Sequence, residues 1–325
     1  MKDLESAGVT RQDYGSHNPG GEMQIGVMIG ADGAANTIDG VVNFAKNVEA
    51  KGLHNVWMAN IFGFDAISIL SIVGRETQRI GLGTAVTPTY PRHPTALAQQ
   101  AMTAAAATGN RFTLGIGLSH KIVIENMLGF SYDRPAAHMR EYLKVLMPLL
   151  SGESVTYQGE QYQVGGVQLS IPGADPVPTV IAALGPLMLK IAGEHTDGTN
   201  TWMVGPKTME EHIVARLSRA AREAGRPSPR VVGGVPVILT HNVDEARQRI
   251  AGGLAMYGQL PSYRAMLDRE GVDGPADIAI VGDENALRGE IERYRNAGVT
   301  DFNAAIMGVE DGAFDRTLDF LASMA

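Results

Sequence analysis

The 325 residues are 44% hydrophobic, enough to bury a large core, and the lack of cysteine excludes disulfides, thiolate metal sites and cysteine nucleophiles. The formal net charge of -8 argues against a general nucleic-acid surface. No window approaches the roughly 20 apolar residues that cross a bilayer, and the polar start lacks the apolar segment of a secretory signal. We therefore expect a cytoplasmic protein with neither nucleic acid nor a membrane as partner.

The chain opens on a polar stretch, residues 1–22, whose richness in Gly, Ser, Asn and Asp predicts a disordered extension or an expression remnant. A regular alternation of strands and helices begins directly after it. The expected elements are strand 24–29, helix 38–51 with Thr37 or Asn36 as its cap, strand 55–59, helix 65–77, strand 80–86, helix 94–109 and strand 112–117. This repetition predicts parallel strands that are covered by helices and joined by right-handed crossovers.

The alternation is interrupted twice. Helices at 122–127 and 134–150 and a hairpin in VTYQGEQYQVGGVQLSI indicate an insertion at 121–176, and a second irregular block with two helical stretches occupies 241–283. Elsewhere the pattern continues with strand 177–183, helix 187–195, strand 198–203, helix 208–224, strand 230–239, helix 284–297, strand 301–306 and helix 314–323.

Eight strands with intervening helices predict an α/β fold, a (β/α)8 TIM barrel that forms a single domain over 23–325 with insertions at its carboxyl-terminal face. A doubly wound open sheet is the rival architecture. No GxGxxG motif with a following acidic residue opens the first unit, which favours the barrel.

Polar residues follow two of the expected strands, 80–86 and 112–117, at their carboxyl ends. Loops at that end of a parallel barrel bind ligands, so this edge is where we expect a site. The residues are Thr87, Tyr90, Arg92 and His93 after the first strand, and Ser119, His120 and Lys121 after the second.

Five passages carry a family resemblance: GTAVTPTYPRHP, NRFTLGIGLSHK, YQGEQYQV, VIAALGPLMLKIAGEHTDG and GVTDFNAAI. With them the chain resembles the luciferase-like monooxygenase superfamily, and within it the branch that uses the deazaflavin coenzyme F420. The resemblance implies a barrel with F420 across its carboxyl-terminal end, hydride transfer to or from a small organic substrate, and a homodimer. An FMN-dependent monooxygenase and a non-catalytic cofactor-binding protein are the alternatives.

The resemblance also implies how the ring is held. Family members often carry a non-prolyl cis peptide at the end of the third strand, and the matching bond here is Ala85–Val86. Its implied role is to bulge against the ring and keep it bent. The full set of implied cofactor contacts is Asn60, Ala85, Val86, Thr87, Ser119, His120, Lys121, Leu184, Gly185, Pro186, Val204 and Gly205.

The cofactor's phosphate is expected at the helix start after Leu184. The N–H groups of Gly185, Leu187 and Met188 can point at an anion there, and family members add backbone donors that correspond to Val204 and Gly205. Without the resemblance, Gly185–Pro186 is equally well a helix-start turn. The charged Arg92, His93 and Lys121 are either contacts of the cofactor's phosphate or glutamate tail, or solvated loop residues.

His120 occupies the position where related F420 enzymes commonly place Glu or Asp. An imidazole with an ordinary pKa near 6.5 can give or take a proton at neutral pH, so His120 is a candidate general acid. The alternative is a ring that only hydrogen-bonds to the cofactor. No second His or carboxylate lies at ligand spacing, so we expect no metal.

Asn60 ends the second strand, where some family members carry a catalytic His. The sequence MAN replaces the Ser-Asp-His pattern of the sugar-phosphate dehydrogenase branch, which casts doubt on sugar-phosphate oxidation. Asn60 either bonds the deazaflavin or caps the turn.

Two sets of aromatic and apolar residues have competing interpretations. Trp57 and Trp202 lie within expected strands, which favours core packing for both. A second set in the block 241–283 either roofs a substrate pocket or packs as core: Met256, Tyr257, Tyr263 and Met266.

Overall fold

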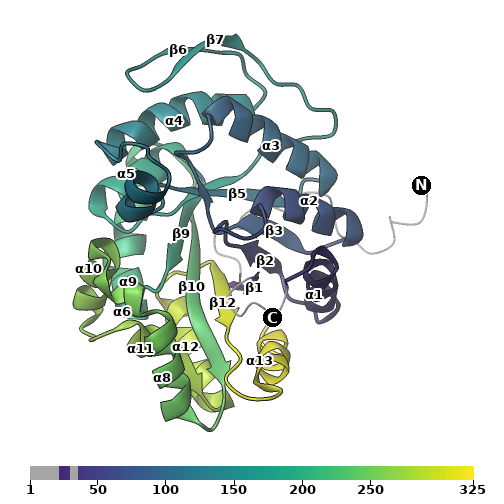
Figure 1. Ribbon diagram of the computed structural model, residues 1–325, viewed down its shortest axis with the longest axis vertical. Helices are drawn as coiled ribbons and strands as arrows, with labels where there is room; N and C mark the ends of the chain where they lie inside the picture. The colour runs from purple at the N-terminus through teal and green to yellow at the C-terminus, as the bar shows by residue number, and fades with distance from the viewer. Residues whose placement is uncertain (1–21, 30–35) are drawn as a thin grey trace.

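The structure, a computed structural model, describes residues 22–29 and 36–325, so the predicted extension lies outside the described residues apart from Glu22. Eight parallel strands form a closed wall (Figure 1). Since β10 pairs with both β9 and β12, no edge remains open, and the predicted (β/α)8 barrel is confirmed over the open sheet. The wall strands are β1 (Gln24–Ile29), β2 (Asn55–Met58), β3 (Gly81–Thr84), β5 (Phe112–Gly117), β8 (Thr179–Ile181), β9 (Gly198–Trp202), β10 (Arg230–Leu239) and β12 (Asp301–Ile306).

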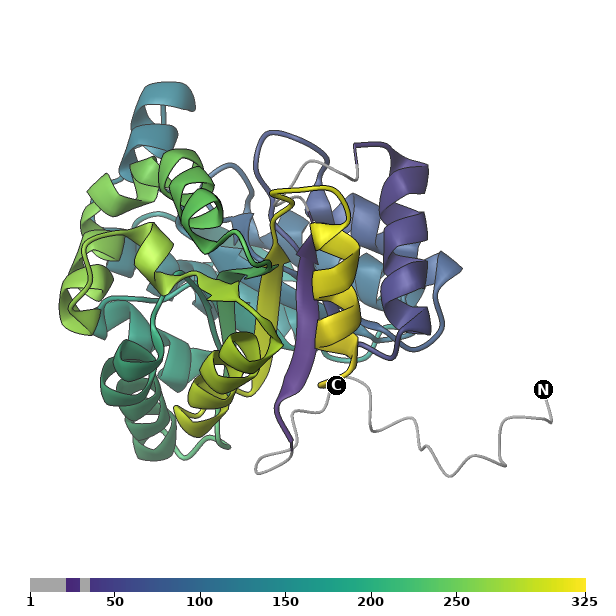
Figure 2. The ribbon, with the colours of Figure 1, turned by 90° about the horizontal axis from the view of Figure 1, so that it is seen from below.

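Helices cover the outside of the wall. Side-chain caps fix several of their starts; for example, Thr37 accepts from Gly40 N at 3.0 Å, and Asp65 accepts from Ser68 N at 2.9 Å. Figure 2 shows β1 and β12, the first and last wall strands, side by side with the closing helix next to them. These helices are α1 (Ile38–Ala50), α2 (Ala66–Glu76), α3 (Pro94–Ala107), α4 (Pro135–Leu150), α5 (Pro186–His195), α12 (Glu284–Asn296) and α13 (Ala313–Ala322).

The expected strand 80–86 is shorter in the structure, because it stops at Thr84 and resumes as the two-residue β4 (Thr87–Pro88). The reason is that the Thr84 side chain makes the hydrogen bonds to β5 that the backbone would make in a regular strand. The Thr84 hydroxyl donates to Gly115 O at 2.7 Å and accepts from Gly115 N at 2.8 Å. A Cβ on Gly115 would lie 1.9 Å from Thr84 O, so only glycine permits this approach.

The block 121–176 contributes one barrel helix and two additions. Helix α4 lies between α3 and α5 in the outer ring. The additions are a π-helical turn, η2 (Ile122–Met127), and the hairpin of β6 (Val155–Gln158) and β7 (Gln163–Val167), which Figure 1 shows outside the ring of helices.

Two later segments differ from the expected helices. The helix expected at 208–224 begins two residues earlier and divides into α6 (Pro206–Thr208), the π-helical η3 (Met209–Val214) and α7 (Ala215–Glu223). The block 241–283 holds four helices rather than two, and a three-residue strand, β11 (Ile280–Gly282), pairs with β10. Three residues are too few to produce a periodic signal. The four helices are α8 (Val243–Gly253), α9 (Ala255–Gln259), α10 (Pro261–Glu270) and α11 (Pro275–Ile278).

Inside the wall, side chains from strands that are not neighbours meet. Trp57, Val180 and Val232 form a buried cluster from β2, β8 and β10, so they touch across the barrel interior. Toward the amino-terminal end Arg230 lies 5.1 Å from the Trp57 ring and closes the interior. Within the residues that the structure describes, no helix has the length and apolar character needed to cross a membrane.

Candidate active site

Two hydroxyl groups on the segment after β3 are buried without a partner. Thr87 Oγ1 and Tyr90 Oη have no hydrogen bond within the described part of the chain. The Tyr90 ring lies between two others, 4.0 Å from His138 at an interplanar angle of 7° and 5.3 Å from Tyr132 at 27°. Because this stack fixes the ring, its hydroxyl keeps one position. An unsatisfied buried hydroxyl at the ligand end of a barrel fits a group that a bound molecule would supply.

His120 follows β5 directly and is half-buried. Burial lowers the pKa of its imidazole below the usual value, so the ring is neutral at pH 7. No side-chain hydrogen bond to its ring nitrogens is found among the described residues. A neutral imidazole can donate one hydrogen bond and accept another, so both nitrogens are available to a ligand.

Aromatic rings surround His120. The centroid of its imidazole lies 5.8 Å from that of Tyr263 and 6.3 Å from that of Tyr257. Tyr257 in turn contacts Tyr263 at 5.0 Å and Trp202 at 6.4 Å. We call Trp202, Tyr257 and Tyr263 the aromatic cluster. It joins the carboxyl end of β9 to helices α9 and α10 of the irregular block.

The other two members of the predicted roof lie elsewhere. Met266 is 3% exposed and belongs to the core, whereas Met256 is 59% exposed. Of the two tryptophans, Trp57 is buried, in agreement with core packing. Trp202 packs against the core only in part and also faces the aromatic cluster.

The peptide bond between Ala85 and Val86 is cis, at the position where the family resemblance implies one. Ala85 packs against the interior cluster of Trp57, Val180 and Val232. Val86 lies over β5, since a Cβ on Gly117 would come within 2.6 Å of Val86 Cγ2. The two residues therefore link the interior to the edge where Thr87 and His120 lie.

The start of α5 has a free anion-binding geometry. Gly185 caps the helix without a side-chain hydrogen bond, Pro186 follows it, and a Cβ on Gly185 would meet nothing within 4 Å. The Leu184 carbonyl, which cannot donate to an anion, accepts from His212 Nε2 at 2.8 Å. The backbone N–H groups of this turn are accessible to a bound anion.

The start of α6 differs, because a carboxylate already occupies it. Glu270 accepts from Lys207 N at 3.2 Å and from Thr208 N at 2.7 Å. A Cβ on Gly205 would lie 2.2 Å from the Glu270 carboxyl carbon, and the neighbouring Val204 carbonyl accepts from Tyr294. An anion can reach this turn only where Glu270 leaves room.

Several predicted contacts have local partners. Asn60 Oδ1 accepts from Ala66 N at 3.0 Å, which is the turn-capping alternative, and its amide group remains free to donate. Lys121 is exposed and lies 3.7 Å from Glu125. Ser119 has a φ of 58° and its carbonyl accepts from the Tyr132 hydroxyl at 3.2 Å.

The remaining charged candidates hold loops together. Arg92 forms a 2.6 Å ion pair with Asp65, the cap of α2. His93 caps α3 by accepting from Thr95 N at 3.3 Å. Both interactions are structural, which leaves neither side chain free for a cofactor tail in this conformation.

His138 is a member of the site that the sequence does not reveal. It lies on α4, contacts Thr89 Oγ1 at 2.9 Å through Nε2 and Gln161 Oε1 at 3.0 Å through Nδ1, and supports the Tyr90 ring. Its burial lowers the pKa of the imidazole, while the hydrogen bond to Gln161 opposes this. In the sequence His138 is a single histidine within an expected helix, and nothing near it indicates contacts with Thr89, Gln161 or Tyr90.

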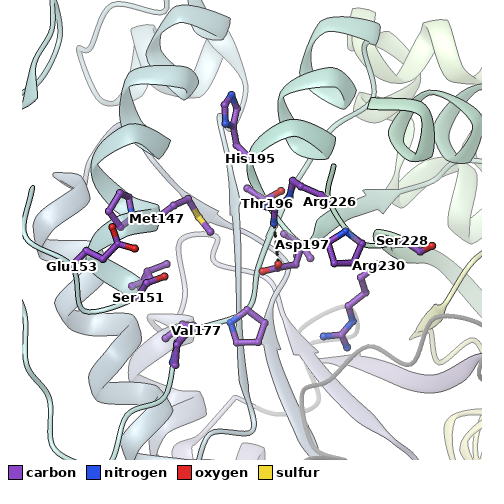
Figure 3. A pocket seen from close by; sticks show the side chains of 16 residues that line it. Met147, Ser151, Glu153, Val177, His195, Thr196, Asp197, Arg226, Ser228 and Arg230 are labelled. Carbon is purple, nitrogen blue, oxygen red and sulfur yellow. Dashed lines mark hydrogen bonds and ion pairs between the residues drawn. The ribbon is translucent and has the colours of Figure 1, made fainter. Parts of the chain in front are cut away.

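A cavity of about 570 Å³ lies at the opposite, amino-terminal end of β8, β9 and β10 (Figure 3). Met147, Ser151 and Glu153 line one side, and Asp197 and Arg226 face each other across a 3.2 Å ion pair on the other. It contains none of the predicted site residues. No group of three His, Asp or Glu side chains suited to a metal ion occurs among residues 22–29 and 36–325.

Comparisons with known proteins give three kinds of match. A family model described as Luciferase-like monooxygenase matches residues 22–301. The chain is 29% identical over 263 residues to 5,10-methylenetetrahydromethanopterin reductase of Methanolobus tindarius, covering 80% of this chain and 79% of that protein. It is 26% identical over 293 residues to F420-dependent glucose-6-phosphate dehydrogenase of Kineococcus radiotolerans, covering 84% of each. The fold matches coenzyme F420 dependent tetrahydromethanopterin reductase of Methanopyrus kandleri with a TM-score of 0.78 at 21% identity, over 93% of this chain and 98% of that one.

Proposed function

Because this chain belongs to the luciferase-like monooxygenase family, we propose that it is a coenzyme F420-dependent oxidoreductase acting on a small organic substrate. The relatives from Methanolobus tindarius and Kineococcus radiotolerans are a reductase and an F420-dependent dehydrogenase. The observation that carries the proposal to this site is a pair of buried hydroxyl groups at the ligand end of the barrel, Thr87 Oγ1 and Tyr90 Oη, which have no hydrogen-bond partner among the described residues.

The described residues fit a deazaflavin at this end. Its ring system would lie over Ala85 and Val86, with Thr87 and the Asn60 amide as hydrogen-bond donors to its polar edge. Ser119 and Lys121 would contact it from the segment after β5. When bound, F420 supplies the hydride-carrying chemistry, and the protein supplies orientation, exclusion of water and a proton.

The phosphate would bind at the start of α5, in the turn formed by Leu184, Gly185 and Pro186. The donors would be the N–H groups of Gly185, Leu187 and Met188. Gly185 leaves that approach open, and the helix dipole favours an anion. Val204 and Gly205 remain predicted donors, on the condition that the Glu270 carboxylate turns away from α6.

His120 would hold or accept the proton that accompanies hydride transfer. Among residues 22–29 and 36–325 no side chain hydrogen-bonds to its ring nitrogens, and the lowered pKa keeps the neutral form available at pH 7. A neutral imidazole donates a hydrogen bond from one nitrogen and accepts at the other, so it can polarise a substrate oxygen in one direction or take its proton in the other.

The test is a titration of the protein with F420 and with FMN side by side, followed by a stopped-flow screen of electrophilic alkenes, imines and ketones with whichever cofactor binds. We expect F420 to bind at micromolar concentration and to turn over with at least one substrate class. Preferential binding of FMN would support a monooxygenase instead. Tight F420 binding without any turnover would support a cofactor-binding protein.

Two further sequence-based expectations belong to the same proposal. We infer that the enzyme acts as a homodimer, as the family resemblance implies, and that it works in the cytoplasm. Light scattering of the purified protein tests the first, and fractionation of cells that make it tests the second.

A further inference from the structure

Exposed apolar side chains gather at the same end of the barrel as His120. Ten large apolar side chains are exposed among the described residues. One of them, Ile72, lies in the middle of α2. The other nine lie near this end: eight in loops, in η2 or in the first turn of a helix after a wall strand, and Met256 next to Tyr257 on α9. They follow β1, β2, β5, β8 and β10, and include Ile61, Phe62, Ile122, Phe130, Leu187 and Met256. We call these nine the apolar rim. Exposed apolar surface that concentrates on one face marks a binding site.

The centre of this face is aromatic. The rings of Tyr257 and Tyr263 lie 6.3 Å and 5.8 Å from the His120 ring, and Trp202 extends the aromatic cluster beyond Tyr257. Aromatic rings pack well on flat unsaturated molecules through stacked or edge-to-face contacts. His120 lies in their midst, and no side-chain partner of its ring nitrogens is found in the described ranges.

Two cations at this face already have a carboxylate neighbour. Arg92 pairs with Asp65 at 2.6 Å, and Lys121 pairs with Glu125 at 3.7 Å. A phosphorylated or carboxylated substrate needs cations that can turn to it, usually in bidentate or charge-assisted contacts. These two pairs, together with the loss of the Ser-Asp-His pattern at Asn60, oppose a sugar phosphate.

We propose that the substrate is an uncharged, largely apolar molecule with a flat unsaturated part. That part packs against the aromatic cluster, the remainder lies on the apolar rim, and a single polar atom meets a ring nitrogen of His120. The proposal rests on the oxidoreductase function above and narrows it to a substrate class.

Menadione, a flat uncharged quinone, and glucose 6-phosphate are suitable opposing probes. The chain has no cysteine for menadione to alkylate, so binding can be followed on the full-length protein without cofactor by calorimetry and tryptophan fluorescence. We expect menadione to bind at least about tenfold more tightly than glucose 6-phosphate. Tyr257→Ala should weaken menadione about fivefold, while Tyr257→Phe, which keeps the ring, stays within about twofold of wild type.

Two variants test where menadione binds. Menadione should quench fluorescence mainly through Trp202, since Trp57 is 1% exposed, so Trp202→Phe should lose most of the quenching. Ile72→Ser, which alters an exposed apolar side chain outside the rim, should leave menadione binding unchanged.

Tighter binding of glucose 6-phosphate than of menadione would overturn the proposal, and so would menadione binding that is indifferent to Tyr257→Ala. If Phe130→Ser changed the oligomeric state and left menadione binding intact, the rim would belong to a second copy of the chain, which also contradicts the proposal. A parallel F420 titration of wild type and Tyr257→Ala distinguishes a failure of the proposed function from a failure of the proposed substrate class. Failure of both to bind F420 defeats the proposed function, whereas the menadione series alone decides the substrate class.

Discussion

The two ends of the barrel treat polar side chains in opposite ways. At the amino-terminal end Arg230 and Asp301 have side chains 8% and 2% exposed, and Arg230 bonds both carboxylate oxygens and Thr113. At the carboxyl-terminal end Thr87 and Tyr90 keep buried hydroxyls without partners within the described ranges. An unsatisfied buried polar group costs about 1–3 kcal/mol, a cost that a ligand can remove. One end therefore stabilises the fold, and we propose that the other is prepared for binding.

The largest expected effect is at the stabilising end. Replacing Arg230 with Met leaves the Asp301 carboxylate buried without its partner, so we expect the free energy of unfolding to fall by about 3–5 kcal/mol in urea titrations. Removing both charges, with Arg230→Met and Asp301→Leu together, should recover much of that loss. Arg226→Met is the matched control, because its 3.2 Å pair with Asp197 is partly exposed and should contribute about 1 kcal/mol or less. Equal losses in the two single variants would show that burial does not distinguish these pairs.

His120→Ala addresses the opposite end. We expect turnover of any substrate that the wild type reduces to fall about 10²–10⁴-fold, the usual contribution of general acid–base catalysis, while F420 affinity and unfolding free energy stay close to wild type. Stopped-flow turnover, F420 titration and urea titration measure the three quantities separately. Unchanged turnover would leave His120 as a scaffold residue and would remove the main catalytic assignment.

A pair of threonines three residues apart gives the sharpest test of the contrast. The Thr84 hydroxyl both donates to and accepts from the backbone of Gly115, whereas Thr87 Oγ1 is buried and has no partner in the part of the chain that the structure describes. Thr84→Val strands the Gly115 N–H and should lower the free energy of unfolding by about 1–3 kcal/mol. Thr87→Val strands nothing, so stability should hold or rise, and F420 affinity should fall about fivefold if the hydroxyl serves the cofactor. Equal destabilisation by both would mean that Thr87 has a protein partner after all.

The regular half of the fold could be predicted from the sequence because its elements are long and periodic. The bounds of β1, β5, β10 and β12 agree with the expected strands, and Thr37 caps α1 as predicted. The interruption at Thr84 could not be read from residue type, since it depends on a side chain replacing a ladder bond to a strand about 30 residues away. The short strand β11 was not predicted because its three residues are too few to show a period.

In the candidate site, too, some residues could be predicted from their place in the sequence, and others depend on contacts that form only in the folded chain. Thr87 and His120 could be proposed from the sequence because they lie shortly after strands, where position alone indicates a ligand face. His138 was not, because its contacts with Thr89 and Gln161 join three segments that only the folded chain brings together. The partners of Asn60 and Arg92, which turn them toward structural roles, likewise depend on loop geometry.

His138 also gives a pH test of a satisfied polar group at the ligand end. Burial lowers the pKa of its imidazole below the ordinary value near 6.5, so below that pH the unfolded chain binds more protons than the folded one. Stability should therefore rise with pH and be lost as pH falls below about 6.5, by at most about 1.4 kcal/mol per pH unit for this group. His138→Gln should flatten that part of the curve in urea titrations between pH 5 and 7. Burial also lowers the pKa of His120, His195 and His212, and these three side chains maintain the rest of the slope. An unaltered slope would assign the dependence to other groups.

Substitution of Glu270 is expected to change stability least among these variants. Its effect on F420 affinity tests whether the ligand end has one anion site or two. Its carboxylate bonds the first N–H groups of α6, as a helix-start anion does, so Glu270→Gln should cost about 0.3–1 kcal/mol of stability. If the F420 phosphate reaches Val204 and Gly205, removing this competing charge should raise F420 affinity severalfold, with a weaker dependence on salt. If the phosphate binds only at Gly185, affinity should not change, and Gly185→Ala, which places a methyl group in the open approach to α5, should weaken F420 instead. Comparing the two variants in F420 titrations at low and high salt assigns the phosphate to one helix start, and loss of affinity in Glu270→Gln would contradict both assignments.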